Sequence, residues 1–419
     1  MITDNAGGLP RYCHPYHGGW DVARIALDIP ESRILFVCPV SCARIICLNA
    51  VKYGYKDRID VLALTEDDIV SGNYEEKTIE AACEVMETVE PKPKALILYV
   101  SCIDAMLGND HSFQTQEIMD RFPGLNCFVL RMCPITRFSG DNPMVALNKD
   151  MAAPLPEEAV EKEKIAAFLG SNIAYDPECE LVKLLTDNGY RALHIEERGA
   201  RYEDYLKIRN ASLNLCLMPF ASSAGKLLSE RFGTPMLPYF SRYDFPSIRK
   251  TLTDLCTALD LQLPDLDRME AETREVLRSC AEQLGDTKLY IDSTATLFPD
   301  ALRKTLSECG FRVAGVFADD IKREAPDCDS GSILRAGDRA YPGEAKSKSN
   351  TIGIGMVSSS FAGTRGTVDI FYDNGEWGFY GLRKLAERIL EAYRNPKTAA
   401  EIRREQRQDP ALYGKEASE

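Results

Sequence analysis

The residues of this sequence best suited to bind a metal are cysteines that occur in three short segments. Cys13 stands in the first, Cys38 and Cys42 in the second (Cys-Pro-Val-Ser-Cys), and Cys102 in the third (Tyr-Val-Ser-Cys-Ile-Asp). The last two segments follow apolar runs typical of buried strands, and the carboxyl ends of parallel strands are where ligands collect. Thiolates there lie near helix N-termini, which stabilise negative charge on metal-bound sulfur. Three or four such thiolates suit an iron–sulfur cluster or a zinc ion.

The residues alone leave the metal and the ligand set open. The Cys-x3-Cys spacing of Cys38 and Cys42 is not a tight ferredoxin or zinc-finger signature, and Cys38 ends an apolar strand where packing alone would explain it. Zinc is the rival metal, because Cys13, His14 and His17 offer the sulfur and nitrogen donors that zinc prefers.

Other polar and sulfur side chains near these segments have weaker claims to a role. Cys133 ends a strand and is an outside candidate, whereas Cys47 falls in a predicted helix and is expected in the core, since free thiols are usually buried. Asp104, Asp110 and His111 follow Cys102 and are in place to relay protons. Capping or solvating a turn is the simpler interpretation of these three residues.

Composition excludes several classes of protein. Hydrophobic residues make up 45% and charged residues 27%, as in globular domains, and no apolar run reaches the roughly 18 residues that span a membrane. The polar N-terminus lacks the apolar region of a secretory signal, so we expect a cytoplasmic protein. A net charge of −14 argues against nucleic acid as a partner. Fourteen cysteines in such a chain indicate metal or redox chemistry.

The elements that must position the cysteines follow from the hydrophobic pattern. Short apolar runs alternate with amphipathic stretches, which predicts parallel strands covered by helices on both faces, and so a doubly wound α/β fold. The predicted strands are residues 34–38, 95–100, 127–130, 165–169, 192–195, 213–217, 288–291, 311–317 and 351–356. An apolar stripe at helical spacing predicts a helix over residues 376–393, ended by Pro396.

Changes in composition predict the domain boundaries. Residues 139–163 are rich in proline and charge and indicate a linker, and residues 319–350 indicate a long polar loop. We expect a cluster-binding domain over 1–150, a second Rossmann-like domain over 151–285, a third over 286–395, and a charged tail over 396–419.

The order of these motifs resembles the nitrogenase component 1 superfamily. That family has a first cysteine before a Gly/Ala turn, a second after the first strand, and a third before an Ile-Gly-Asp-Asp-like sequence. Cys13, Cys42 and Cys102 match these positions, the last before Leu-Gly-Asn-Asp. The likeness continues in Ala-Ser-Leu-Asn-Leu from Ala211, in Leu-Ser-Glu-Arg-Phe-Gly-Thr-Pro, and in Asn-Gly-Glu-Trp-Gly-Phe-Tyr-Gly-Leu from Asn374. It therefore covers nearly the whole chain and implies three Rossmann-like domains with doubly wound parallel sheets.

The sequence departs from true nitrogenases at the ligands of their large cofactor. The family's cysteine of the second domain aligns with Met218, although Cys216 stands two residues away. The family's histidine before the closing helix aligns with Asn374, and no histidine follows His194. The resemblance therefore implies no iron–molybdenum-type cofactor and no reduction of dinitrogen.

The resemblance implies an iron–sulfur subunit of an ATP-dependent reductase. A separate ATP-hydrolysing iron protein would deliver the electrons, since this chain lacks the P-loop motif Gly-x-x-x-x-Gly-Lys-Ser/Thr. Cys13, Cys42 and Cys102 would bind a 4Fe–4S or larger P-cluster-like group, shared across a homodimer or heterodimer of component 1 subunits, or completed by Cys38 within one chain. Relatives reduce tetrapyrrole double bonds, cyclise a nickel tetrapyrrole or cleave carbon–sulfur bonds, so a small organic or tetrapyrrole-type substrate is expected. A scaffold for metallocluster assembly and transfer is the alternative, and a cluster-free binding protein is a third hypothesis.

Overall fold

The computed structural model describes most of the chain between residues 25 and 397. Cys13, His14, His17, Cys133 and nearly all of the predicted loop 319–350 lie outside the described residues. The chain forms two compact units, which we call the N-terminal unit (described residues 25–171 and 192–238) and the C-terminal unit (173–191 and 239–397). Within these limits the description omits residues 53, 132–142, 159, 172, 196–199, 293–294, 318–348, 356–363 and 371–373.

The first sheet of the N-terminal unit holds the strands that precede the predicted cysteine ligands. Its strands are β1 (Ser32–Pro39), β2 (Ile59–Leu64), β3 (Ala95–Val100) and β4 (Asn126–Arg131), in the spatial order β2-β1-β3-β4. All three pairings are parallel, and Val37 of β1 lies opposite Val100 of β3. Every side chain of β3 is completely buried, which explains why this strand is a continuous apolar run.

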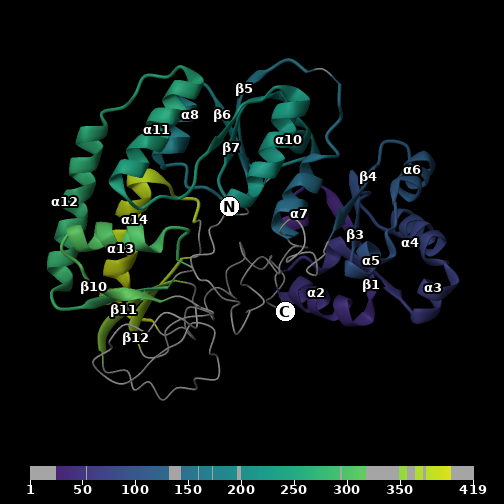
Figure 1. Ribbon diagram of the computed structural model, residues 1–419, viewed down its shortest axis with the longest axis horizontal. Coiled ribbons are helices and arrows are strands. Elements are labelled where there is room, and N and C mark those ends of the chain that lie inside the picture. The colour runs from purple at the N-terminus through teal and green to yellow at the C-terminus, as the bar shows by residue number, and fades with distance from the viewer. Residues whose placement is uncertain are drawn as a thin grey trace. The chain divides into compact units, whose positions relative to one another are not determined.

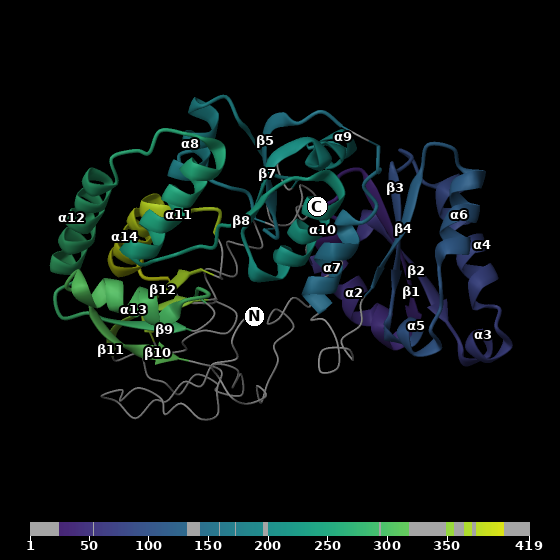
Figure 2. The ribbon, with the colours of Figure 1, turned by 45° about the horizontal axis from the view of Figure 1, so that its top comes forward.

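Helices cover both faces of this sheet (Figure 2). Helices α2 (Val40–Lys52) and α7 (Pro143–Ala152) lie on one face, and α4 (Tyr74–Thr88) and α6 (Ser112–Arg121) lie on the other. Alternate residues of β1 accordingly belong to two different cores, with Phe36 and Cys38 in one and Leu35 and Val37 in the other. Two short helices, α3 (Glu66–Ser71) and α5 (Cys102–Leu107), follow the carboxyl ends of β2 and β3.

Helix α7 corrects the prediction of a linker over residues 139–163. Met144 and Leu147 are buried and Met151 packs partly buried against the same core, so the helix has an apolar face at the spacing i, i+3, i+7. The surrounding Pro, Gly, Asp and Asn residues hide this short periodicity in the sequence. The helix packs on α10 (Ser222–Phe232) as well as on β4, and such tertiary packing supplies most of the stability of a short helix.

The second sheet also belongs mainly to the N-terminal unit. Its strands are β5 (Glu163–Leu169), β6 (Arg191–Leu193), β7 (Ala211–Cys216) and β8 (Met236–Pro238), in the order β6-β5-β7-β8. Helices α9 (Tyr202–Leu206) and α10 (Ser222–Phe232) accompany it. Gly225 brings α10 close to β7 and β8, because a Cβ atom there would lie 2.8 Å from the Cys216 sulfur and 2.9 Å from the Met236 sulfur.

The C-terminal unit contains the third sheet (Figure 1). Its strands are β9 (Lys288–Asp292), β10 (Arg312–Phe317), β11 (Ser349–Gly355) and β12 (Thr364–Asp369), in the order β10-β9-β11-β12 with parallel pairings. The last helix, α14 (Gly378–Arg394), packs on β11, β12 and α12. The unit's other helices are α8 (Glu180–Asp187), α11 (Phe245–Leu259), α12 (Leu266–Leu284) and α13 (Pro299–Glu308).

Three four-stranded parallel sheets confirm the predicted α/β fold class. Each predicted strand overlaps a strand of the structure, and α14 carries the predicted apolar stripe. The sequence prediction lacks β2, β8 and β12, which stand at the edges of their sheets. Strand β2 is largely half-buried and β8 has only three residues, so their apolar signal is weak, and Val368 is the single large apolar residue of β12. The three sheets fall inside the three predicted domain ranges, whose exact boundaries stay a prediction. None of the described helices is long and apolar enough to cross a membrane.

Candidate functional site

The strand order of the first sheet creates a topological switch point between β1 and β3. From β1 the chain moves to β2 on one side of the sheet, and then returns to β3 on the other side. In open α/β sheets, ligands bind outside the carboxyl ends of the strands at such a point. Cys38 and Cys42 lie at the end of β1 and in the first turn of α2, and Cys102 lies two residues beyond the end of β3. The fold therefore brings these three predicted ligands to one edge of one sheet.

The four described thiols near the switch point have different surroundings. The side chain of Cys38 is 0% exposed, and burial, with smaller contributions from Cys42 and Cys47, raises its pKa to about 12. Cys42 and Cys102 are half-buried, so each keeps part of its surface exposed to solvent. Cys47 is exposed, and the prediction that it packs in the core is wrong because it lies on the outer face of α2.

These surroundings fit a metal cluster at Cys42 and Cys102 better than at Cys38. Soft, accessible sulfur donors are what iron–sulfur clusters require. Among the described residues no group of three His, Cys, Asp or Glu side chains could hold a metal ion, so Cys38, Cys42 and Cys102 are not gathered into one metal site. Cys13, the third ligand that the resemblance implies, lies outside these residues.

A buried polar network surrounds the side chain of Asp104, two residues after Cys102. Tyr74 Oη donates a hydrogen bond of 2.8 Å to Asp104 Oδ1, and Nε2 of His111 lies 2.5 Å from the same oxygen. Asn109 Nδ2 donates to it at 3.3 Å. Asp104 and His111 are thus internal, so the interpretation that their side chains cap or solvate a turn is wrong for these two residues. Asp110 does cap the next helix, because its Oδ1 accepts from the Ser112 amide at 2.9 Å.

Sequence reasoning missed Tyr74 in this network. It is the first residue of α4 and lies 30 positions before Asp104 in the chain. A buried aromatic residue at a helix start is an ordinary core signal. Only a hydroxyl group that needs a buried partner distinguishes Tyr74 from Phe, and the partner is not visible in the sequence.

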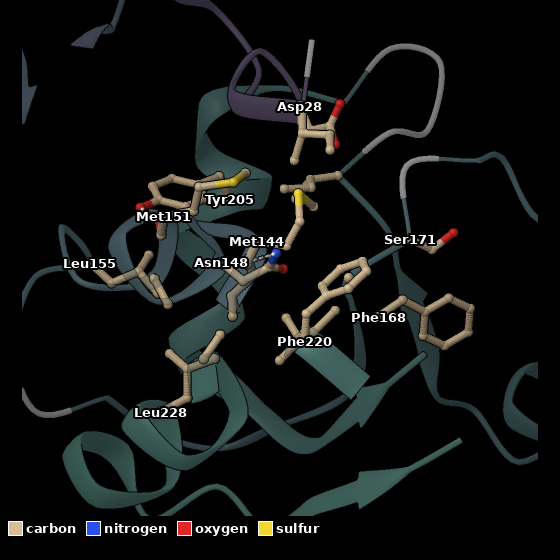
Figure 3. A pocket seen from close by; sticks show the side chains of 17 residues that line it. Asp28, Met144, Asn148, Met151, Leu155, Phe168, Ser171, Tyr205, Phe220 and Leu228 are labelled. Atoms are coloured by element: carbon tan, nitrogen blue, oxygen red, sulfur yellow. Dashed lines mark hydrogen bonds between the residues drawn. The ribbon is translucent and has the colours of Figure 1, made fainter. Parts of the chain in front are cut away.

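A cavity of about 80 Å³ lies elsewhere in the N-terminal unit (Figure 3). Met144, Asn148 and Met151 of α7 line it together with Phe220 and with Phe168, whose ring lies beside that of His194. The Asn148 amide donates to the Met144 carbonyl oxygen at 2.9 Å. Since ligand pockets commonly have volumes of roughly 300–1,000 Å³, we interpret this small apolar space as a packing gap.

The positions aligned with the ligands of the large nitrogenase cofactor have ordinary surroundings. Met218 is buried just after β7. Cys216 is completely buried, its sulfur lies against Gly225, and burial raises its pKa to about 12. Asn374 is partly exposed before α14. The Cys216 side chain therefore packs between β7 and α10.

Comparisons with known proteins agree with this architecture. No curated protein sequence matches this chain. Two solved structures named "Nitrogenase Cp1 at pH 6.5" and "Nitrogenase Cp1 at pH 5" are similar to it, each at 14% sequence identity. The first has a TM-score of 0.63 and covers 92% of this chain and 93% of its own. The second has a TM-score of 0.55 and covers 88% and 86%.

At such identity these structures show the fold, and they confirm the predicted component 1 architecture. The family evidence comes from the sequence itself. Residues 19–331 match the family described as "Nitrogenase component 1 type Oxidoreductase", and this range includes the first two sheets together with Cys38, Cys42 and Cys102. The chain therefore belongs to the nitrogenase component 1 type oxidoreductase family.

Proposed function

We propose that this protein is the iron–sulfur subunit of a nitrogenase-like, ATP-dependent reductase. Cys13, Cys42 and Cys102 bind a 4Fe–4S or larger cluster, and Cys38 is the candidate for a fourth ligand. A separate ATP-hydrolysing iron protein supplies electrons, which the cluster accepts and gives up one at a time. The substrate is a small organic or tetrapyrrole-type molecule. The observation that carries this proposal is the placement of two accessible cysteines, Cys42 and Cys102, at the switch point of the first sheet.

Metal analysis of the anaerobically purified full chain tests the cluster. We expect about four iron atoms per chain for a 4Fe–4S cluster within one chain and about two for the same cluster shared by two chains, with a similar amount of acid-labile sulfide and an EPR signal after reduction with dithionite. Zinc in place of iron, or no metal, would contradict the proposal. Turnover of an organic substrate with ATP and the iron protein separates the reductase from its alternative. A scaffold would instead transfer its cluster to an acceptor protein without turnover.

The outer face of α2 supports the proposal that a second component 1 subunit covers this edge. Val40, Leu48 and Val51 are 66%, 61% and 68% exposed, and they lie on one side of the helix together with Arg44 and Cys47. The opposite side packs its apolar residues into the core. Contiguous exposed apolar side chains are typical of a subunit interface. A homologous subunit seated here would cover the exposed thiol of Cys47, whereas Cys42 packs against the core on the opposite side of α2.

Charged substitutions on this face are expected to weaken the dimer. In the double variant Leu48→Asp/Val51→Asp, two carboxylates would be buried without partners, so the dissociation constant should rise at least about tenfold. Light scattering coupled to size exclusion, under anaerobic conditions, measures the change. Val70→Asp is the control, because Val70 is 87% exposed on α3, outside this face. A monomeric wild-type protein, or a double variant as dimeric as the control, would refute the interface.

A further inference from the structure

We propose that Asp104 is a positioning residue for Cys102, and that Tyr74, Asn109 and His111 hold its carboxylate in place for this purpose. The inference rests on the proposed role of Cys102 as a cluster ligand. In this inference, residues that do not themselves bind the metal determine the position of the Cys102 sulfur and its orientation toward the metal. Such outer residues orient ligands and tune the metal.

Side chains from two segments of the chain converge on one atom of Asp104. Tyr74 begins α4, Asn109 lies in the turn after α5, and His111 immediately precedes α6. All three place a donor nitrogen or oxygen within 3.3 Å of Oδ1. Because α4 and α6 pack on each other and on the sheet, the carboxylate is tied to a rigid layer.

The backbone transmits this constraint to Cys102. The Asp104 amide donates to the Ser101 carbonyl oxygen at 3.1 Å, and the Gly108 amide donates to the Asp104 carbonyl oxygen at 3.0 Å. Cys102 lies between Ser101 and Asp104, inside the first turn of α5. A helix of six residues has little stability of its own, so anchoring must come from tertiary contacts. The contacts to the Asp104 side chain meet this need.

The turn between α5 and α6 does not by itself require a buried carboxylate at Asp104. Asp104 is 4% and His111 2% exposed. A polar side chain whose Oδ1 atom has three hydrogen-bonding neighbours is therefore kept inside the protein, where an apolar residue would commonly be at least as stable. Three hydrogen-bonding neighbours on one carboxylate oxygen give Asp104 a fixed geometry, which the nearby ligand cysteine requires.

A thiol-reactivity experiment tests the inference without any metal. The rate of alkylation of Cys102 by iodoacetamide is measured in the cluster-free full chain, relative to the half-buried Cys83 of the same molecule. We expect Asp104→Asn and Tyr74→Phe to change this ratio several-fold, because the first turn of α5 loses its anchor. Asp68→Asn is the matched control. Asp68 is a buried carboxylate of α3 that is bonded to Thr65 and to Lys77 of α4, and α3 contains no cysteine.

Reconstitution with ferrous iron and sulfide provides the second readout. Iron affinity is expected to fall about tenfold in Asp104→Asn, with shifted EPR g-values and midpoint potential, whereas Asp68→Asn should match the wild type. A folded Asp104→Asn protein with unchanged Cys102 reactivity and unchanged g-values would overturn the inference. If Asp104→Asn does not fold, Tyr74→Phe, which keeps the carboxylate, decides by the same criteria. If the wild type binds no iron, the proposed function fails, while the alkylation ratio still decides the role of Asp104.

Discussion

Replacing Cys42 or Cys102 by alanine is expected to remove nearly all cluster iron from the purified protein. Each substitution deletes one accessible thiolate at the switch point of the first sheet, and no neighbouring described thiol is equally accessible at the strand ends, since Cys38 is completely buried. An iron–sulfur cluster that loses one of its few thiolate ligands becomes labile, and outer residues cannot replace a ligand. The loss should be accompanied by the loss of electron acceptance from the iron protein.

Iron and sulfide content, with EPR of the reduced protein, measure this effect across a cysteine series. Cys13→Ala should behave like Cys42→Ala and Cys102→Ala, whereas Cys83→Ala, on α4, should retain the wild-type iron content. Cys38→Ala distinguishes the two ligand sets. Iron retained in that variant favours a cluster shared with a second subunit, and iron lost favours a site within one chain. Iron unaffected by all three family cysteines would refute the assigned site.

Gly375→Ala is expected to destabilise the C-terminal unit by about 3 kcal/mol, because the new methyl group adds both backbone strain and a steric clash. Gly375 has a φ of +68°, which residues with a side chain rarely adopt. A Cβ atom there would lie 2.2 Å from the Ala174 carbonyl oxygen and 2.8 Å from the Tyr175 Cα atom. Both are backbone atoms, and they cannot move away as the end of a flexible side chain can. The Asp176 amide also donates to the Gly375 carbonyl oxygen at 2.9 Å, so the two segments are tied together.

Urea unfolding, followed by tryptophan fluorescence, measures the free energy of unfolding of the C-terminal unit. The sequence has two tryptophans, so a Trp20→Phe background leaves Trp377, which is buried beside α14, as the single reporter. Gly189→Ala is the matched control. Gly189 has a φ of +76°, but a methyl group there would meet no other atom within 4 Å, so this variant should lose only about 1 kcal/mol. An equal loss of unfolding free energy in Gly375→Ala and Gly189→Ala would contradict the prediction, because the clash with Ala174 would then add no destabilisation.

The sequence alone predicted most of the fold, and it places the candidate ligands Cys42 and Cys102 after strands. Hydrophobic periodicity is a local property, and buried parallel strands such as Ala95–Val100 leave a continuous apolar run that needs no knowledge of their neighbours. The half-exposed edge strand β2 lacks this signal, and α7 is hidden among residues typical of loops. The formation of β2 and of α7 depends on packing against elements that are distant in the sequence.

Cysteines placed after strands are also visible in the sequence, because their position requires only the end of an apolar run. Tertiary structure alone decided which of these thiols are accessible. The order β2-β1-β3-β4 brings Cys42 and Cys102 to one switch point, while the packing of α2 buries Cys38 and exposes Cys47. The Asp104 network is likewise a product of folding, because Tyr74 lies 30 residues away in the chain. Strand order, burial and hydrogen bonds between distant residues arise from long-range packing, and a linear pattern of residue types does not encode them residue by residue.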